Sequence, residues 1–212
     1  MSVKYKNLLF DFDGCLVSSI DFWIKIYKEA LAEFDSYPSD KELMFHIGDW
    51  DMWKHFGVTD EAKFVEIVNA KLGDLHDRQV LSENAQEVLE ILSPNHKMAV
   101  VSSGVKVNIL DALTKNEDDH HFQAIIGVGE VENYKPHPEP VHLAIELLKG
   151  THETSIMIGD SRKDIEAATN AGIHSILYYP KEHENTHDLD MLMSYEPTYV
   201  VNSLLEIPDI VS

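Results

Sequence analysis

Short apolar runs recur along the chain, and each ends abruptly in polar residues. Most are apolar throughout and rich in β-branched side chains, which is typical of strands buried on both faces. The predicted strands are Lys6–Asp11, Lys97–Ser102, Ala124–Val128, Ser155–Gly159, Ser175–Tyr179 and a short one around Thr198–Val201. The helical patterns between them predict helices at Glu83–Leu92, Val105–Leu113, Pro138–Lys149 and Arg162–Ala171. This alternation predicts an α/β fold, in which helices cover both faces of a parallel sheet.

The stretch from Ser18 to about Leu81 interrupts the alternation, because it contains no good strand pattern. Its amphipathic patterns predict helices at Ile20–Phe34, Lys41–His46, Met52–Phe56 and Glu61–Leu72. We interpret residues 15–81 as a helical domain inserted into a core formed by residues 1–14 and 82–212. Two other polar stretches, Asn116–His121 and Lys181–Asp190, are interpreted as solvated loops or frayed helix.

Composition narrows the class of protein. With 44% hydrophobic residues, a chain of 212 residues can bury a substantial core. No apolar run approaches the roughly 18–20 residues that cross a bilayer, and the N-terminus lacks the pattern of a signal peptide. The single cysteine, Cys15, cannot form an internal disulfide, which favours a reducing compartment. We therefore expect a soluble, cytoplasmic protein.

The charge balance bears on partners and substrate. Lys and Arg number 17 against 37 Asp and Glu, a formal net charge of −20 that repels nucleic acid and anionic membranes. The same field opposes anionic substrates, so a phosphate site needs local positive charge, and a divalent metal is the obvious source. Only Arg78 and Arg162 are arginines, which leaves lysine and metal as the phosphate-binding candidates.

Acidic residues follow two of the predicted strands. Asp11 and Asp13 end the first strand and point the same way, because side chains alternate along a strand. Asp160 ends the fourth strand, and Asp164 begins the next helix. The carboxyl ends of such strands open onto an active-site crevice, and carboxylate oxygens suit Mg²⁺. The alternatives are an exposed Asp-Gly turn at the first strand and a helix cap at Asp160 or Ser161.

Two further segments offer groups that suit a phosphoryl oxygen. Ser102 and Ser103 end the second strand and supply a hydroxyl and backbone N–H groups, although serine also caps helices. Lys135 lies in a loop stiffened by two prolines, whereas a lone lysine is usually a solvated surface charge. Lys163 is expected on the exposed face of its helix.

Taken in order, four elements resemble those of the haloacid dehalogenase-like (HAD) hydrolase superfamily. They are Asp-Phe-Asp-Gly at 11–14, Ser102, Lys135, and Gly159-Asp160 through Asp164. The resemblance covers the core, about two-thirds of the chain. It implies a Rossmann-like three-layer core with a mostly parallel sheet and an inserted α-helical cap domain.

The resemblance also implies a role for each residue. Asp11 would attack phosphorus, and Asp13 would act as general acid and then as general base. Asp11, the Asp13 carbonyl and Asp160 would bind Mg²⁺. Ser102 and Lys135 would hold the transferring phosphoryl group, and Asp164 would support Lys135 and the waters of the metal.

The spacing of these elements locates the insertion. Between Asp11 and Ser102 lie 90 residues (12–101), which leaves room for a helical cap. Between Ser102 and Lys135 lie only 32 (103–134), too few for a second cap. The chain is therefore similar to the helical-cap branch, which includes phosphoglycolate phosphatases and β-phosphoglucomutases. Many relatives carry Thr-Leu-Val-Asp after the glycine, whereas Cys-Leu-Val-Ser stands here at 15–18.

The predicted cap should close over the strand ends, hinged near Cys15–Ser19 and Val80–Glu83. We expect its facing surface to set specificity through His46, Trp50 and Lys54, although Trp50 packing inside the cap is an equal alternative. A separate pattern, His-Glu-x-x-His at 183–187, matches zinc proteases. Its polar neighbours argue against the buried helix that such a site needs.

These patterns predict a Mg²⁺-dependent phosphatase that forms an aspartyl-phosphate on Asp11. Its partner would be a small phosphorylated metabolite, with no nucleic acid and no membrane. One alternative is a β-phosphoglucomutase-like phosphosugar mutase, and another is a non-catalytic phosphate-binding protein on the same fold. A phosphonate hydrolase would need a Schiff-base lysine, for which Lys54 is the candidate. A metal-independent dehalogenase is disfavoured, because Asp13 and Asp160 are both present.

Overall fold

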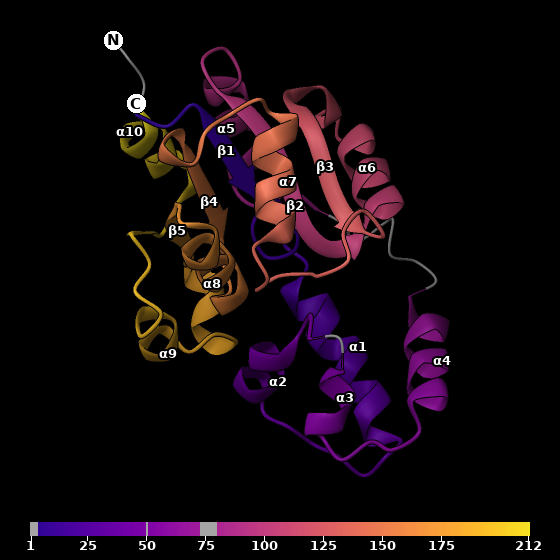
Figure 1. Cartoon of the computed structure of the whole chain (residues 1–212). Coiled ribbons are helices and arrows are strands. Elements are labelled where there is room, and N and C mark those ends of the chain that lie inside the picture. Colours follow the sequence, from indigo (N-terminus) through magenta and orange to yellow (C-terminus); the bar gives the residue numbers. More distant parts are fainter. Residues whose placement is uncertain (1–3, 50, 73–79) are drawn as a thin grey trace.

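The computed structural model describes residues 4–49, 51–72 and 80–212. Its centre is a six-stranded sheet in the order β3-β2-β1-β4-β5-β6, in which every pairing is parallel (Figure 1). The strands are β1 Asn7–Phe10, β2 Lys97–Val105, β3 Phe122–Val128, β4 Ser155–Gly159, β5 His174–Tyr178 and β6 Tyr199–Val201. The predicted α/β class with a parallel sheet is confirmed.

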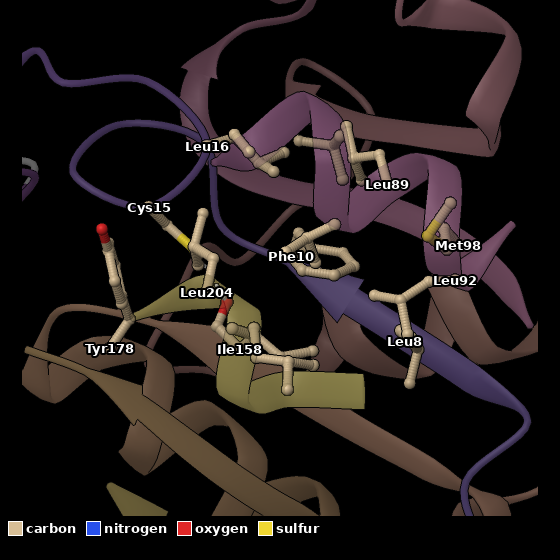
Figure 2. Close-up of a cluster of buried hydrophobic side chains, with 14 of the residues drawn as sticks. Leu8, Phe10, Cys15, Leu16, Leu89, Leu92, Met98, Ile158, Tyr178 and Leu204 are labelled. Carbon is tan, nitrogen blue, oxygen red and sulfur yellow. Dashed lines mark hydrogen bonds between the residues drawn. The ribbon is translucent and has the colours of Figure 1, made fainter. Parts of the chain in front are cut away.

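Helices cover both faces of the sheet, because successive strand residues point to opposite sides. Leu8 and Phe10 face a cluster with Leu89 and Leu92 (Figure 2) that also includes residues 109–113 and 207–211, and Leu9 faces a cluster formed with residues 141–148 and 167–171. All three side chains are fully buried. The helices of this core are α5 Ala85–Leu92, α6 Lys106–Lys115, α7 Glu139–Leu147, α8 Arg162–Ala171, α9 Leu189–Met193 and α10 Ile207–Val211. Short 3-10 helices are η2 Asp119–His121, η3 His152–Thr154, η4 Lys181–Asn185 and η5 Leu204–Glu206.

Four further helices form a separate group, here called the helical unit, with its own apolar cluster. They are α1 Ile20–Ala32, α2 Asp40–His46, α3 Met52–His55 and α4 Glu61–Lys71. Ile24, Leu31, Leu43 and Phe64 are buried at its centre, and the unit lies below the carboxyl edge of the sheet in Figure 1. Treating residues 15–81 as a domain of its own stays a proposal.

Two neighbouring segments connect the helical unit to the core. Val17 and Leu81 form an antiparallel bridge. Ser18 N–H donates to the Val80 carbonyl at 2.9 Å, and Ser82 N–H donates to the Leu16 carbonyl at 2.9 Å. The two predicted hinge segments therefore pair with each other, so any movement of the unit would involve both.

The interpretation of two polar stretches as solvated loops or frayed helix is wrong for five of their side chains. Asp118 and His121 are buried in the first, and His183, Thr186 and His187 are buried in the second. Polarity suggested solvent, but these side chains turn inward because the chain folds back into 3-10 turns at η2 and η4. The second strand also runs to Val105, three residues past its predicted end, with an irregular register after Val101.

No helix within the described ranges combines the length and the apolar character needed to cross a membrane.

The buried centre of the helical unit makes one stability prediction. Leu31→Ala should lower the free energy of unfolding by about 2–5 kcal/mol, because Leu31 is fully buried in the unit's own cluster. Urea denaturation followed by tryptophan fluorescence measures this, since all three tryptophans lie in this part of the chain. Val65→Ala on the exposed side of α4 is the control and should change the value by less than about 0.5 kcal/mol. Equal losses in both variants would contradict the assigned core.

Candidate active site

The sheet brings the ends of three strands to one place. Phe10 of β1 pairs with Val100 of β2 and with Ile158 of β4, so Asp11 and Asp160 leave adjacent strands at nearly the same level. The chain runs outward from β1 through β2 and β3 before it returns to β4, which makes this point a topological switch. Such switch points form crevices at the carboxyl edge of an α/β sheet.

The turn after β1 is buried, which excludes an exposed Asp-Gly turn. Gly14 has φ +79°, a conformation that favours glycine, and a Cβ there would overlap the Asp160 carboxylate. Gly14 is also buried, and Asp11 is only 8% exposed. The glycine therefore lets the first turn approach the acid that follows β4.

Lys135 joins two of the predicted acids. Its buried ammonium lies 2.8 Å from Asp11 Oδ1 and donates to Asp164 Oδ1 at 2.6 Å. The other Asp164 oxygen, Oδ2, accepts from the N–H and the hydroxyl of Ser161 at 3.1 and 2.6 Å. Burial on its own lowers the pKa of Lys135, but Asp11 and Asp164 outweigh it and raise the pKa. Asp164 thus positions the lysine as well as beginning α8.

Asp11 is held in one orientation. Its Oδ1 accepts from the Phe12 N–H at 2.7 Å and contacts the Lys135 ammonium. Burial and the neighbouring Asp164 carboxylate raise the pKa of Asp11 well above its usual range, and the Lys135 charge opposes this rise without cancelling it. A cation placed beside these acids would favour their ionised forms.

Asp13 accepts hydrogen bonds from residues at the start of helix α1. Its Oδ1 accepts from the Ser19 hydroxyl at 2.6 Å and from Trp23 Nε1 at 2.8 Å. Burial raises the pKa of Asp13, although these two hydrogen bonds act in the opposite direction. Neither donor is predicted from the sequence, where the only signal is their position directly after the first motif. A raised pKa favours the protonated form that a general acid requires.

Asp160 has an unpredicted partner in His187. Asp160 Oδ2 lies 2.9 Å from His187 Nε2, and His187 Nδ1 lies 2.8 Å from the Thr186 hydroxyl. An ionised carboxylate can only accept, so the imidazole donates to it. Burial on its own raises the pKa of Asp160, but the His187 hydrogen bond and charge outweigh it and lower the pKa. His187 belongs to the pattern that was considered only for a zinc protease.

His183 lies beside this pair. Its ring stacks on His187 with 4.1 Å between centroids, and burial lowers its pKa to about 4. It is therefore neutral near pH 7 and packs against His187 without adding charge. Both histidines are buried and pack next to Asp160.

The acids present a set of oxygens that fits a divalent cation. Asp11, Asp160 and Asp164 each offer a carboxylate oxygen, and these atoms lie within 4.8 Å of one another. Asp160 Oδ1 is buried and has no hydrogen-bond partner among the described residues, which suits a metal ligand. Hard cations such as Mg²⁺ prefer such oxygens. The Asp13 carboxylate is not in this group, and the ligand atom predicted there is its backbone carbonyl.

The acids open into a cavity of about 430 Å³ between the core and the helical unit. Ser102, Ser103 and Lys135 line its core side, and Trp23 and Gly48 are among the residues on the other side. Ser102 is 6% exposed, and its hydroxyl accepts from the Gly104 N–H at 3.0 Å. The cavity has the size of a small-molecule site.

The residues expected to set specificity are placed differently. His46 and Lys54 do not line this cavity. His46 Nδ1 lies 3.1 Å from Asp49 Oδ2, and the Lys54 side chain is 65% exposed with Asp51 at 3.4 Å. This location also removes Lys54 as a Schiff-base candidate. Trp50 lies outside the described residues.

The expectation for Lys163 is wrong. Lys163 is 4% exposed and lines the cavity, because α8 begins at the carboxyl edge of the sheet and its first turn faces the helical unit. Helical periodicity in a sequence predicts which residues share a face of the helix. It does not predict which other element covers the first turn of that helix.

Comparison with known proteins agrees with this geometry. The sequence model of the haloacid dehalogenase-like hydrolases matches residues 8–178. Pyrophosphatase PpaX of Listeria welshimeri is 33% identical over 181 residues, which cover 81% of this chain and 82% of that protein.

Solved structures show the same fold. A hydrolase of the haloacid dehalogenase-like family from Streptococcus pneumoniae has a TM-score of 0.80 at 19% identity, covering 99% of both chains. A protein described as a HAD-hydrolase, YfnB from Bacillus subtilis, was solved with bound magnesium and has a TM-score of 0.72 at 18% identity, covering 99% of both chains. The chain described here is a hydrolase that belongs to the haloacid dehalogenase-like family.

Proposed function

We propose that the protein is a Mg²⁺-dependent phosphatase that hydrolyses a small phosphate monoester through an aspartyl-phosphate on Asp11. The observation that carries the proposal is the contact of Lys135 with both Asp11 and Asp164, beside Asp160 and in the lining of the cavity between the core and the helical unit. Phosphoryl transfer needs positioned charge more than other chemistry, and this arrangement provides it. The pyrophosphatase name of the Listeria relative points to the same kind of reaction, hydrolysis at phosphorus, on an anhydride in place of an ester.

The nucleophile is the Asp11 carboxylate. Its Oδ1 is held by Phe12 N–H and Lys135, which leaves Oδ2 as the oxygen for attack on phosphorus. Ser102 and Ser103 line the cavity opposite, where their hydroxyl and N–H groups can bind the phosphoryl oxygens. Lys135 neutralises charge on the transferring group while Asp164 keeps its ammonium in place.

Asp13 carries out both proton transfers of the proposed reaction. In its protonated form it gives a proton to the leaving oxygen, and as a carboxylate it then takes one from the water that cleaves the aspartyl-phosphate. Ser19 and Trp23 hold one of its oxygens, which leaves the other for the exchange.

A bound Mg²⁺ would neutralise negative charge on the phosphoryl oxygens. Asp11, Asp160 and the Asp13 carbonyl would hold it, and the donated hydrogen bond from His187 would fix the orientation of Asp160.

The proposed cap domain is residues 15–81, which contain the helical unit. It covers the carboxyl edge of the sheet, and its closure excludes water from the first step and large substrates from the cavity. The substrate is therefore a small phosphorylated metabolite rather than a phosphoprotein or a nucleic acid. With one buried cysteine and this substrate class, we place the enzyme in the cytoplasm.

Asp11→Asn should abolish phosphate release, because an amide cannot form the aspartyl-phosphate. Asp13→Asn should lower kcat by roughly 10²–10⁴-fold, the usual contribution of a positioned acid or base. Phosphate release is measured across a panel of small phosphate esters with Mg²⁺, and circular dichroism verifies the fold of each variant. Turnover of Asp11→Asn at the wild-type rate would refute the assigned nucleophile.

Removing divalent cations should abolish turnover, and Mg²⁺ should restore it. Ca²⁺ should not, because it does not impose the octahedral geometry of Mg²⁺. The measurement is phosphate release in chelator, followed by titration with each cation. Undiminished activity in excess chelator would rule out the proposed metal.

His187→Leu should weaken Mg²⁺ binding by roughly 10–100-fold, because the ligand Asp160 loses the donor that orients it. His187→Gln retains a donor and should recover part of the loss. Calorimetric titration of Mg²⁺ measures the affinity directly, alongside the Mg²⁺ dependence of turnover. The matched control is His137→Leu, whose side chain is 51% exposed and lies 3.9 Å from Glu139. An unchanged affinity in His187→Leu would show that the contact is only structural.

A further inference from the structure

His183 and His187 are buried side chains in a segment that is otherwise polar and largely exposed. They are 5% and 3% exposed, whereas Glu184, which lies between them in the sequence, is exposed. The segment folds as the 3-10 helix η4 and a turn, not as the α-helix that carries the site of a zinc protease. An exposed Glu184 is not placed to act as the general base of such an enzyme, so the pattern does not indicate a protease. The two imidazoles nevertheless lie together beside a carboxylate.

Asp160, His183 and His187 form a compact set of metal-binding atoms. Each residue offers one nitrogen or oxygen, and these three atoms lie within 4.8 Å of one another. His183 Nδ1 is buried and has no hydrogen-bond partner among the described residues. Leaving a buried nitrogen unpaired costs free energy, and in native proteins such an atom often marks a bound water or ion.

Thr186 determines which nitrogen of His187 carries a hydrogen on the side away from Asp160. The Thr186 hydroxyl donates to the His183 carbonyl at 3.3 Å, so its oxygen accepts from His187 Nδ1 at 2.8 Å. The other ring nitrogen, Nε2, faces Asp160 Oδ2 at 2.9 Å. Histidines that bind metal through one ring nitrogen usually donate a hydrogen bond from the other, which holds the ring in place. His187 has this arrangement, and a metal ion would replace the hydrogen on Nε2.

The surroundings of these residues favour a cation. Asp160 lies beside Asp11 and Asp164, so negative charge is concentrated there. Asp160 Oδ1 is the oxygen left for the proposed Mg²⁺, whereas Oδ2 faces His187, so two ions would use different oxygens of one carboxylate. A cavity of about 20 Å³, whose lining includes Thr186 and His187, has room for a single water or ion next to the ring.

We propose that Asp160, His183 and His187 bind a second divalent metal ion of the Zn²⁺ class, beside the proposed Mg²⁺ site. Two imidazole nitrogens and one carboxylate oxygen suit Zn²⁺, whereas Mg²⁺ prefers oxygen ligands alone. The rings of His183 and His187 stack at 4.1 Å between centroids. Two imidazoles that bind one ion lie in planes that meet at the ion, so His183 turns out of this stack on binding. The site does not depend on which reaction the enzyme catalyses.

The test is calorimetric titration of the full chain with Zn²⁺, after removal of bound metal by a chelator. Excess Mg²⁺ is present throughout, because it occupies oxygen sites and competes poorly for imidazole. Thr186→Val removes only the hydroxyl that holds His187 and should weaken Zn²⁺ binding by roughly 10–100-fold. His183→Phe keeps an aromatic ring in the stack but loses a ligand, and should weaken the binding at least as much.

His142→Phe is the matched control. His142 Nδ1 lies 3.0 Å from His152 Nε2 in an exposed pair, which offers Zn²⁺ two nitrogens at the surface. Any ion bound by this pair disappears in His142→Phe, whereas the ion of the proposed site stays. Zinc binding that is lost in His142→Phe and unchanged in His183→Phe would place the ion at the surface and overturn the proposal.

Asp11→Asn separates the proposed site from the Mg²⁺ site, because it removes a proposed Mg²⁺ ligand and none of the three Zn²⁺ ligands. Zinc binding that survives in Asp11→Asn and is lost in His183→Phe supports the proposal whether or not the enzyme is a phosphatase. The reverse result would place Zn²⁺ among the carboxylates and overturn the proposal, as would a wild type that binds no Zn²⁺. Co²⁺ in place of Zn²⁺ gives a second readout, since its visible absorption depends on its ligands. Identical Co²⁺ spectra in wild type and His183→Phe would also contradict the site.

Discussion

The architecture of the site depends on one constraint, the burial of several carboxylates at a single edge of the sheet. Asp11, Asp160 and Asp164 lose hydration there and repel one another, which is costly unless each charge is compensated. The compensation is local, because the chain as a whole is strongly negative. Lys135 binds between two of the acids, and His187 donates to the third. Among the described residues, Asp160 Oδ1 has no hydrogen-bond partner, and the proposed Mg²⁺ would compensate its charge.

The sheet makes this concentration of charge possible. Leu8, Leu9 and Phe10 are fully buried, so β1 is anchored on both faces and Asp11 follows with no freedom to move toward solvent. The same apolar anchoring holds β4, from which Asp160 emerges. Packing free energy from the two apolar clusters therefore offsets the electrostatic cost at the strand ends. The apolar core therefore stabilises the fold against the repulsion between the carboxylates of the site.

The sequence predicted those parts of the fold and site that depend on local pattern. Apolar runs located the strands, and a strand end followed by acids located Asp11 and Asp160. The missed contributions come from residues whose partners lie far away along the chain. His187 meets Asp160 only because η4 turns back toward the sheet, and Lys163 is covered only because Asp49 of the helical unit lies beside it. Polarity suggested solvent for both, since composition does not reveal which element will cover a side chain.

Two contacts beside the cavity join a residue of the core to a residue of the helical unit. Trp23, from α1, holds the Asp13 oxygen, and Asp49, from the helical unit, lies beside Lys163 on α8. Displacing the helical unit would break both contacts together. Burial raises the pKa of Asp13 and the Trp23 hydrogen bond lowers it, and Asp49 supports the charge of Lys163, so both groups respond to the position of the helical unit. The surroundings of Asp13 and of Lys163 are thus linked through the position of one structural element.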